Sequence, residues 1–167
     1  MKILKALLVT TLIVGLFYSC EKDDFCTLTP VTPNLIIRFY DRTETDVTKE
    51  ALLLSVIAED KTDSLYTSED ADSIAIPLNT LATETVYILK KNEVDGLENN
   101  NQYMQFTVSY TPEDDYVSRS CGYRVIFNEV SAEMAGYSTS TEAWASEFSI
   151  EEESITSETN AHIYIYH

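Results

Sequence analysis

The stretch MQFTVSY, residues 104–110, alternates apolar and polar side chains more cleanly than any other part of this chain. Met104, Phe106, Val108 and Tyr110 fall on one side of the alternation, and polar residues separate them. Successive side chains of a β-strand point to opposite faces of its sheet. The pattern therefore predicts a strand with one face in a hydrophobic core and the other in water.

Further segments on both sides of this strand have the composition of short strands. Apolar, aromatic and β-branched residues dominate them, and residues typical of turns separate them. We expect strands at 35–41, 52–58, 73–78, 84–91, 116–130 and 161–166, a brief strand at 64–67 and a weaker one at 144–150. Helices near 47–54 and at 144–150 are the alternatives. A turn is expected at 111–115 and a loop at 131–141.

No long amphipathic helix accompanies these strands, so two sheets must cover each other's apolar faces. We predict an all-β protein, an antiparallel β-sandwich of roughly seven to nine strands. An immunoglobulin-like arrangement is the first choice and a jelly roll is the second. A barrel ranks third, because Pro77 cannot donate a ladder hydrogen bond and therefore marks 73–78 as an edge strand of an open sheet.

The composition indicates one folded domain and excludes several classes of partner. Residues 34–167 suit a single β-sandwich domain, and apolar residues make up 44% of the chain, far more than in a disordered acidic chain. The chain has 11 Lys and Arg against 28 Asp and Glu, a formal net charge of −17. Binding to a phosphate backbone needs clustered Lys and Arg, so we expect no nucleic-acid partner.

The N-terminal residues have the parts of a secretory signal. Residues 1–5 include two lysines, and residues 6–18 form an apolar run interrupted by two threonines and a glycine. This run is shorter than the roughly 20 residues that a spanning helix needs. A basic start, a short apolar region and a small residue at the cut, here Ser19, define such a signal. Residues 1–19 are therefore predicted to be a removed signal peptide.

Cys20 stands directly after this cut, which resembles a bacterial lipoprotein signal. In such proteins the new N-terminal cysteine carries acyl chains, and two chains are enough for stable anchoring. We therefore expect a lipid-anchored protein whose residues 20–33 form an acylated tether and whose partner is the membrane. A plain secretory signal without acylation is the alternative.

The residues after the cysteine, Glu21, Lys22, Asp23 and Asp24, resemble the acidic export signal of lipoproteins from the Bacteroidetes. That signal sends lipoproteins through the outer membrane to the cell surface. The resemblance implies an outer-membrane location with surface exposure. A periplasm-facing protein, with these residues as an ordinary solvated tether, is the alternative.

Two cysteines remain beyond the lipidation site, Cys26 and Cys121. An exported protein folds in a compartment that permits disulfides. We predict one bridge between them, which would contribute about 4–5 kcal/mol in the chain-entropy model. Two buried free thiols are the alternative. No CxxC or Cys–His spacing supports a redox or zinc site, so no metal and no cofactor are expected.

Several segments together resemble an uncharacterised lipoprotein family of the Bacteroidetes. The segments are CEKDD at 20–24 with Cys26, TP at 29–30 and 32–33, LIIRFYD at 35–41, DSIAIPL at 72–78, YVSRSCGY at 116–123 and AHIYIY at 161–166. The resemblance implies lipid anchoring and a single domain. It implies no activity, so no catalytic residue is carried over.

Five residues form a candidate ligand face. Arg38 and Arg119 stand out because the chain has few arginines, and either could bind a ligand or pair with a carboxylate on a neighbouring strand. His162, Tyr164 and Tyr166 alternate along the last expected strand and could present an aromatic surface to a sugar or peptide. The simpler interpretation of this strand is partial packing of its tyrosines on a neighbour.

Nothing in the sequence marks a catalytic group. The acidic clusters lack the spacing and the glycine of an EF-hand. Ser118 and Ser120 lack the glycine pattern of a nucleophile elbow. We therefore predict a noncatalytic binding or assembly module at the cell envelope, with an envelope protein or a glycan as its partner. The alternative is an envelope enzyme that acts on glycans or peptides.

Overall fold

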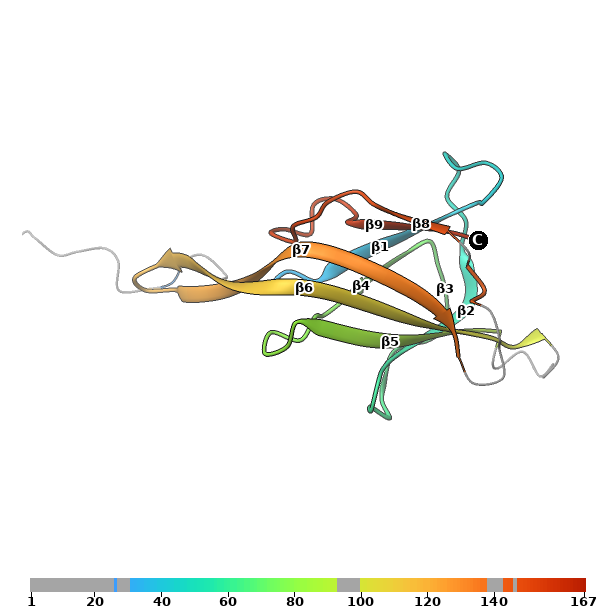
Figure 1. Ribbon diagram of the computed structural model, residues 1–167, viewed down its shortest axis with the longest axis horizontal. Coiled ribbons are helices and arrows are strands. Elements are labelled where there is room, and N and C mark those ends of the chain that lie inside the picture. Colours follow the sequence, from blue (N-terminus) through green and yellow to red (C-terminus); the bar gives the residue numbers. More distant parts are fainter. Residues whose placement is uncertain (1–25, 27–30, 93–99, 138–142, 146) are drawn as a thin grey trace, which may run out of the picture. The chain divides into compact units, whose positions relative to one another are not determined.

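The computed structural model describes Cys26 and residues 31–92, 100–137, 143–145 and 147–167. These residues form strands and connections without an α-helix, so the predicted all-β sandwich is confirmed and the helical alternatives are wrong (Figure 1). The described residues contain no helix with the length and hydropathy needed to cross a bilayer.

Nine strands are found in the described part of the chain. They are β1 (Leu35–Tyr40), β2 (Ala51–Ala58), β3 (Ser64–Ala71), β4 (Ser73–Ile76), β5 (Glu84–Lys91), β6 (Gln102–Ser118), β7 (Gly122–Gly136), β8 (Glu147–Ile150) and β9 (Ile163–Tyr166).

The strands form two sheets. A four-stranded sheet has the order β4-β1-β9-β8, and a five-stranded sheet has the order β3-β2-β5-β6-β7. The predicted edge position of β4 is therefore correct. The pair β1–β9 is parallel, whereas the pairs β1–β4 and β8–β9 are antiparallel. The strand order is not that of an immunoglobulin sandwich, whose first two strands share one sheet, because β1 and β2 belong to different sheets.

The core lies between the inner faces of these two sheets. Alternate residues of β1, β4, β9 and the first half of β6 enter it, and for the strand at 104–110 this is what the alternation in the sequence predicted. The fully buried side chains of β1 and β6 include Leu35, Ile37, Phe39, Met104, Phe106 and Val108. A hydroxyl on β3 also joins the edges of the two sheets, because Tyr66 Oη accepts a hydrogen bond from Ala75 N at 2.9 Å.

The expected turn at 111–115 is wrong, because β6 runs through these residues without a break. Its pairing with β5 ends near Ser109, so Pro112 interrupts no hydrogen bond to β5. Side chains of β7 also hold this part of β6: Asn128 Nδ2 donates to Glu113 at 2.7 Å, and Arg124 Nε donates to Asp115 at 2.8 Å. Cross-strand pairs of this kind stabilise a sheet.

The loop expected at 131–141 is also wrong as far as residue 136, because β7 continues to Gly136. The reversal between β6 and β7 lies instead just before Gly122, whose φ of +75° is a left-handed conformation that favours glycine. The sequence contains only four glycines, so this position is a specific turn signal.

The end of this hairpin belongs to a compact unit of its own. Residues 116–123 cluster with the N-terminal segment through Pro30, whereas residues 31–115 and 124–167 form the sandwich unit. Within the smaller unit Cys26 and Cys121 form a disulfide with a Cα–Cα distance of 4.8 Å. The predicted bridge is confirmed, and the alternative of two free thiols is excluded.

Candidate ligand-binding site

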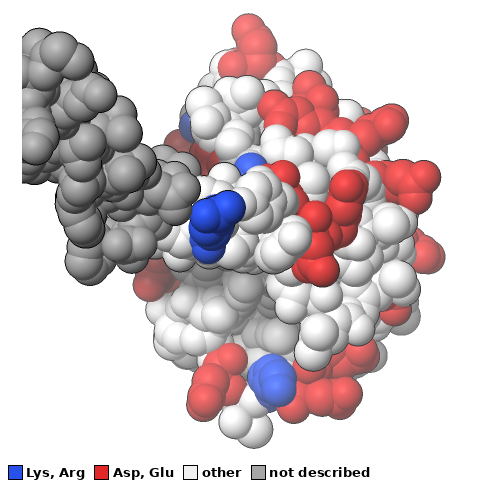
Figure 2. All heavy atoms as spheres, turned by 90° about the vertical axis from the view of Figure 1, so that its left-hand side faces the viewer, with Lys and Arg blue, Asp and Glu red and all other residues white. Residues whose placement is uncertain are grey.

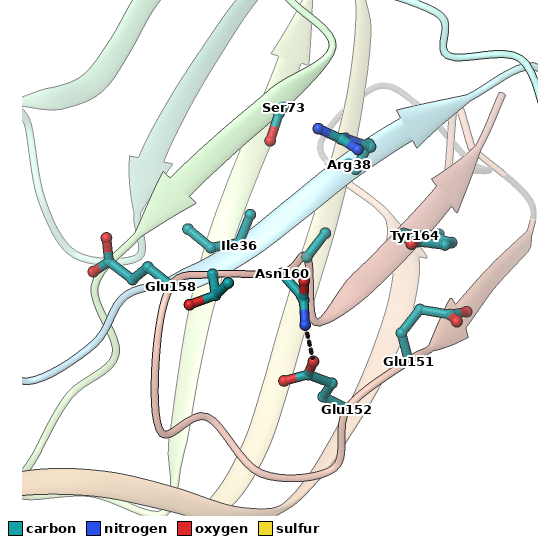
Figure 3. Close-up of a pocket in the computed structure, with 10 residues that line it drawn as sticks. Ile36, Arg38, Ser73, Glu151, Glu152, Glu158, Asn160 and Tyr164 are labelled. Carbon is teal, nitrogen blue, oxygen red and sulfur yellow. Dashed lines mark hydrogen bonds between the residues drawn. The ribbon is translucent and has the colours of Figure 1, made fainter.

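A pocket of about 540 Å³ lies on the outward side of the four-stranded sheet, bordered by the connection between β8 and β9 (Figure 3). Its lining contains three glutamates and one arginine, so the pocket is polar rather than hydrophobic. The lining residues are Ile36, Arg38, Ser73, Glu151, Glu152, Glu158, Thr159, Asn160, Ala161 and Tyr164.

The floor of the pocket follows from strand alternation. Leu35, Ile37 and Phe39 of β1 are fully buried, so the residues between them face outward. Arg38 is the central residue of this floor, because its Cα is paired with Ser73 on β4 and with Tyr164 on β9. Three strands therefore bring three polar side chains together at one level of the sheet.

The wall is the connection from β8 to β9, and local hydrogen bonds hold its polar side chains. Asn160 Nδ2 donates to Glu152 Oε1 at 3.0 Å. The backbone N–H of Asn34, just before β1, donates to Glu158 Oε1 at 2.7 Å. Ser149 Oγ donates to Glu151 Oε1 at 2.6 Å. All three carboxylates are thus accepting bonds that fix the wall in place.

His162 is buried completely and does not belong to the exposed face, so this part of the predicted ligand face is wrong. Its Nδ1 accepts a hydrogen bond from the Ile36 N–H at 2.9 Å. A nitrogen that accepts carries no proton, so the ring is neutral and its Nε2–H donates to Ser157 O at 2.9 Å. The 4.0 Å approach of Glu152 to the same ring is therefore not an ion pair. Burial lowers the pKa of His162, in agreement with the neutral ring.

A cluster of tyrosine rings continues outward from the pocket. The ring of Tyr40 lies 4.7 Å from that of Tyr164 and 6.0 Å from that of Tyr166, measured between centroids. Tyr164 lines the pocket, and Tyr166 adjoins it through Tyr40. Partial burial and then the neighbouring Tyr40 raise the pKa of Tyr164, so its hydroxyl remains protonated at neutral pH.

Arg38 is exposed, and within the described chain no carboxylate lies within ion-pair distance of its guanidinium. The contrast with other cations is clear, because Arg42 pairs with Glu147 and Arg124 pairs with Asp115. A guanidinium offers five N–H donors in a fixed plane. Arg38 can therefore direct donors into a pocket whose glutamates supply acceptors.

The wider surface is acidic. Figure 2 shows one face on which carboxylate side chains are spread widely and basic side chains are sparse. The described residues hold no group of three or more His, Cys, Asp or Glu side chains arranged to bind a metal ion. From its own side chains the pocket can supply hydrogen bonds, three carboxylates and the positive charge of Arg38 to a ligand.

The remaining predicted site residues lie elsewhere. Arg119 is exposed on the hairpin end in the smaller unit. Cys20 and the acidic run Glu21–Asp24 lie outside the described residues, so their predicted roles as lipidation site and export signal stay predictions. Of the five residues of the predicted ligand face, the structure brings Arg38, Tyr164 and Tyr166 together.

The sequence interpretation missed the wall. None of its residues, Glu151, Glu152, Glu158 or Asn160, belongs to the ligand face predicted from the sequence. One signal could have located them. The wall residues lie between two segments that are expected to be strands, 144–150 and 161–166. If these two strands pair, the connection between them must pass the end of the strand that carries Tyr164.

The fold and pocket define a two-sheet β-sandwich protein with a polar pocket on the outer face of its smaller sheet. A family of unknown function (DUF6452) matches residues 53–167, which is more than half of the chain, and the protein belongs to this family. The matched segment includes the pocket wall and Tyr164 but not β1. No curated protein and no solved structure is significantly similar to the chain.

Proposed function

We propose that this protein is a lipid-anchored, noncatalytic binding module of the bacterial outer membrane and that its pocket holds a saccharide. The observation that carries the proposal is Arg38, which is exposed in a concave polar site beside the ring of Tyr164 and has no ion-pair partner among the described residues. Sugar hydroxyls accept hydrogen bonds from a guanidinium and donate them to carboxylates, and their C–H faces pack against aromatic rings.

The volume of the pocket supports a small ligand. Ligand pockets commonly enclose roughly 300–1,000 Å³ and use a few well-placed polar groups to fix orientation. A cavity of about 540 Å³ falls in this range. A glycan is favoured over a protein partner, because a protein interface needs a broader surface than this concavity provides.

The location rests on the N-terminal residues. A short apolar run that ends at Cys20 and the acidic residues after it support acylation and export. In cells fed a radioactive fatty acid, the protein should be labelled and the Cys20→Ser variant should not. Replacing Lys22, Asp23 and Asp24 with alanine should protect the protein from protease added to whole cells. Unchanged digestion would instead support a location that does not depend on this run.

Binding is tested with the full-length protein and oligosaccharides released from the cell's own envelope polysaccharides, with affinity measured by calorimetry. Arg38→Ala should weaken binding by about tenfold or more, because a charge-assisted hydrogen bond is lost. Arg42→Ala is the matched control, since Arg42 is paired with Glu147 and does not line the pocket. Equal affinity of the two variants would refute the pocket as the binding site.

An envelope enzyme is the second candidate, favoured by the three glutamates in the wall. Glycoside hydrolysis commonly needs two carboxyl groups, one to donate a proton and one to act as base or nucleophile. Glu152 and Glu158 already accept bonds that hold the wall. Release of new reducing ends by the purified protein, abolished in Glu152→Gln, would replace the binding proposal with this one.

A further inference from the structure

The end of the β6–β7 hairpin, Tyr116–Tyr123, combines exposed aromatic rings with an absence of acidic residues. These eight residues contain no Asp or Glu and one arginine, in a chain with 28 acidic residues. The side chains of Tyr116 and Tyr123 are also among the most exposed large hydrophobic side chains, at 56% and 64%. Their rings contact each other edge to face at 5.3 Å between centroids. The hairpin end therefore presents an aromatic pair with no carboxylate in its own sequence.

The disulfide ties this hairpin end to the N-terminal segment. Cys121 lies within the hairpin end and is bonded to Cys26, which follows Cys20 by six residues. An extended chain spans at most about 3.3–3.6 Å per residue, so six residues reach about 20 Å. Whatever conformation those residues adopt, covalent geometry keeps Cys121 within about 25 Å of Cys20, because the disulfide adds a Cα–Cα distance of 4.8 Å.

We propose that the hairpin end Tyr116–Tyr123 is a second membrane contact, with the rings of Tyr116 and Tyr123 in the headgroup region of the bilayer that holds the acyl chains of Cys20. This inference rests on the proposed lipid anchor. Tyrosine is enriched at membrane–water interfaces, because its ring is apolar and its hydroxyl can remain hydrated. A guanidinium such as that of Arg119 also suits lipid phosphates.

Charge permits this segment to approach the lipid, and the disulfide to Cys26 distinguishes it from other segments without acidic residues, such as 73–83. The mature chain has 9 Lys and Arg against 28 Asp and Glu, because Lys2 and Lys5 leave with the signal, so its net charge is about −19. Carboxylates resist transfer into the interface and are repelled by anionic lipids. A hairpin end that lacks them can approach the interface at a lower electrostatic cost than the acidic loops of this protein.

The test uses the full-length acylated protein in vesicles of phosphatidylcholine and phosphatidylethanolamine with bromine atoms on the upper acyl chains. Tyr116→Trp places an added indole at the hairpin end, and Leu81→Trp is the matched control on the sandwich, where Leu81 is 95% exposed. Bromine should quench the added emission of Tyr116→Trp by about half and leave that of Leu81→Trp nearly unchanged. The signal of the native Trp144 is common to both variants and is subtracted.

The disulfide gives a second comparison. In a Cys26→Ser, Cys121→Ser background that remains folded by circular dichroism, quenching at residue 116 should fall, since the anchor no longer holds the hairpin end nearby. Equal quenching of the two tryptophans in acylated wild-type background would overturn this inference and leave the anchor intact. Mass spectrometry that finds Cys20 unmodified would overturn the anchor and this inference together.

Discussion

The imidazole of His162 supports the pocket wall from inside the core. It accepts from β1 through the Ile36 N–H and donates to Ser157 O in the connection between β8 and β9. One buried ring therefore joins the floor of the pocket to its wall. In the sequence His162 alternates with Tyr164 and Tyr166, and this pattern predicts that all three side chains share one exposed face. The alternation does not reveal that the imidazole is buried.

Replacing His162 tests this linking role. His162→Phe should lower the free energy of unfolding by about 2–4 kcal/mol, because the Ile36 N–H and the Ser157 carbonyl lose their partners on the buried ring. His162→Asn should cost less, since its amide retains an acceptor near the position of Nδ1. Urea unfolding followed by far-ultraviolet circular dichroism measures both. Equal stability of the Phe variant and the wild type would show that the two hydrogen bonds make no net contribution.

At the scale of the element, the pairing of β2 with β3 is irregular, and side chains accept hydrogen bonds from backbone N–H groups of these two strands. Their register shifts three times, and Leu53 and Ser68 have φ values of 47° and 55°. Side chains take over where the ladder is interrupted: Leu53 N donates to Asp70 Oδ1 at 2.8 Å, and Ser68 N donates to Ser55 Oγ at 3.0 Å. Such irregularities leave backbone groups that need other partners.

Ser55→Ala should therefore destabilise the protein by about 1–2 kcal/mol, although it removes a single oxygen. The side chain of Ser55 is nearly inaccessible, so water cannot readily replace its bond to Ser68 N. Ser64→Ala, on the same pair of strands but without a described side-chain bond to the ladder, is the control. Urea midpoints that coincide for the two variants would contradict this role of Ser55.

The elements that could be predicted are those in which alternation coincides with burial. The strand at 104–110 and the inward residues of β1 followed from period two alone. The extension of β6 through Pro112 did not, because it depends on Arg124 and Asn128 of β7, which no local pattern reveals. The pocket is similar: Arg38 and Tyr164 both belong to the predicted ligand face, but the sequence does not show that they are neighbours, which depends on the parallel pairing of β1 with β9.

The disulfide also belongs to this scale, because it connects two elements that are distant in sequence. Cys26 and Cys121 are separated by 95 residues, and a closed loop of that length restricts the unfolded chain strongly. Reduction, or the double change Cys26→Ser and Cys121→Ser, should lower the free energy of unfolding by about 4–5 kcal/mol in the chain-entropy model. Adding a reductant to the double variant should change nothing further, and a loss well below 1 kcal/mol would contradict the prediction.

For the whole molecule, two histidines make stability depend on pH. Burial, followed by the nearby Lys91 cation, lowers the pKa of His167 to about 4, and burial lowers the pKa of His162. In the unfolded chain both would titrate near about 6.5. Between these values the unfolded chain binds protons that the folded protein does not, so the free energy of unfolding decreases as pH falls.

We therefore expect the urea midpoint to be lower at pH 5.0 than at pH 7.5. His167 alone should contribute about 1 kcal/mol of this loss, reduced from the full shift because its ring is only partly buried. The hydrogen bond from Thr43 lowers the pKa of Asp41, but that carboxylate affects stability only at lower pH, as its unfolded value of about 3.8 is approached. The side chain of the His167→Gln variant cannot take up a proton in this range. The urea midpoint of this variant should therefore fall less between pH 7.5 and pH 5.0 than that of the wild type. A pH dependence identical to that of the wild type would show that this ring titrates alike in the folded and unfolded chains.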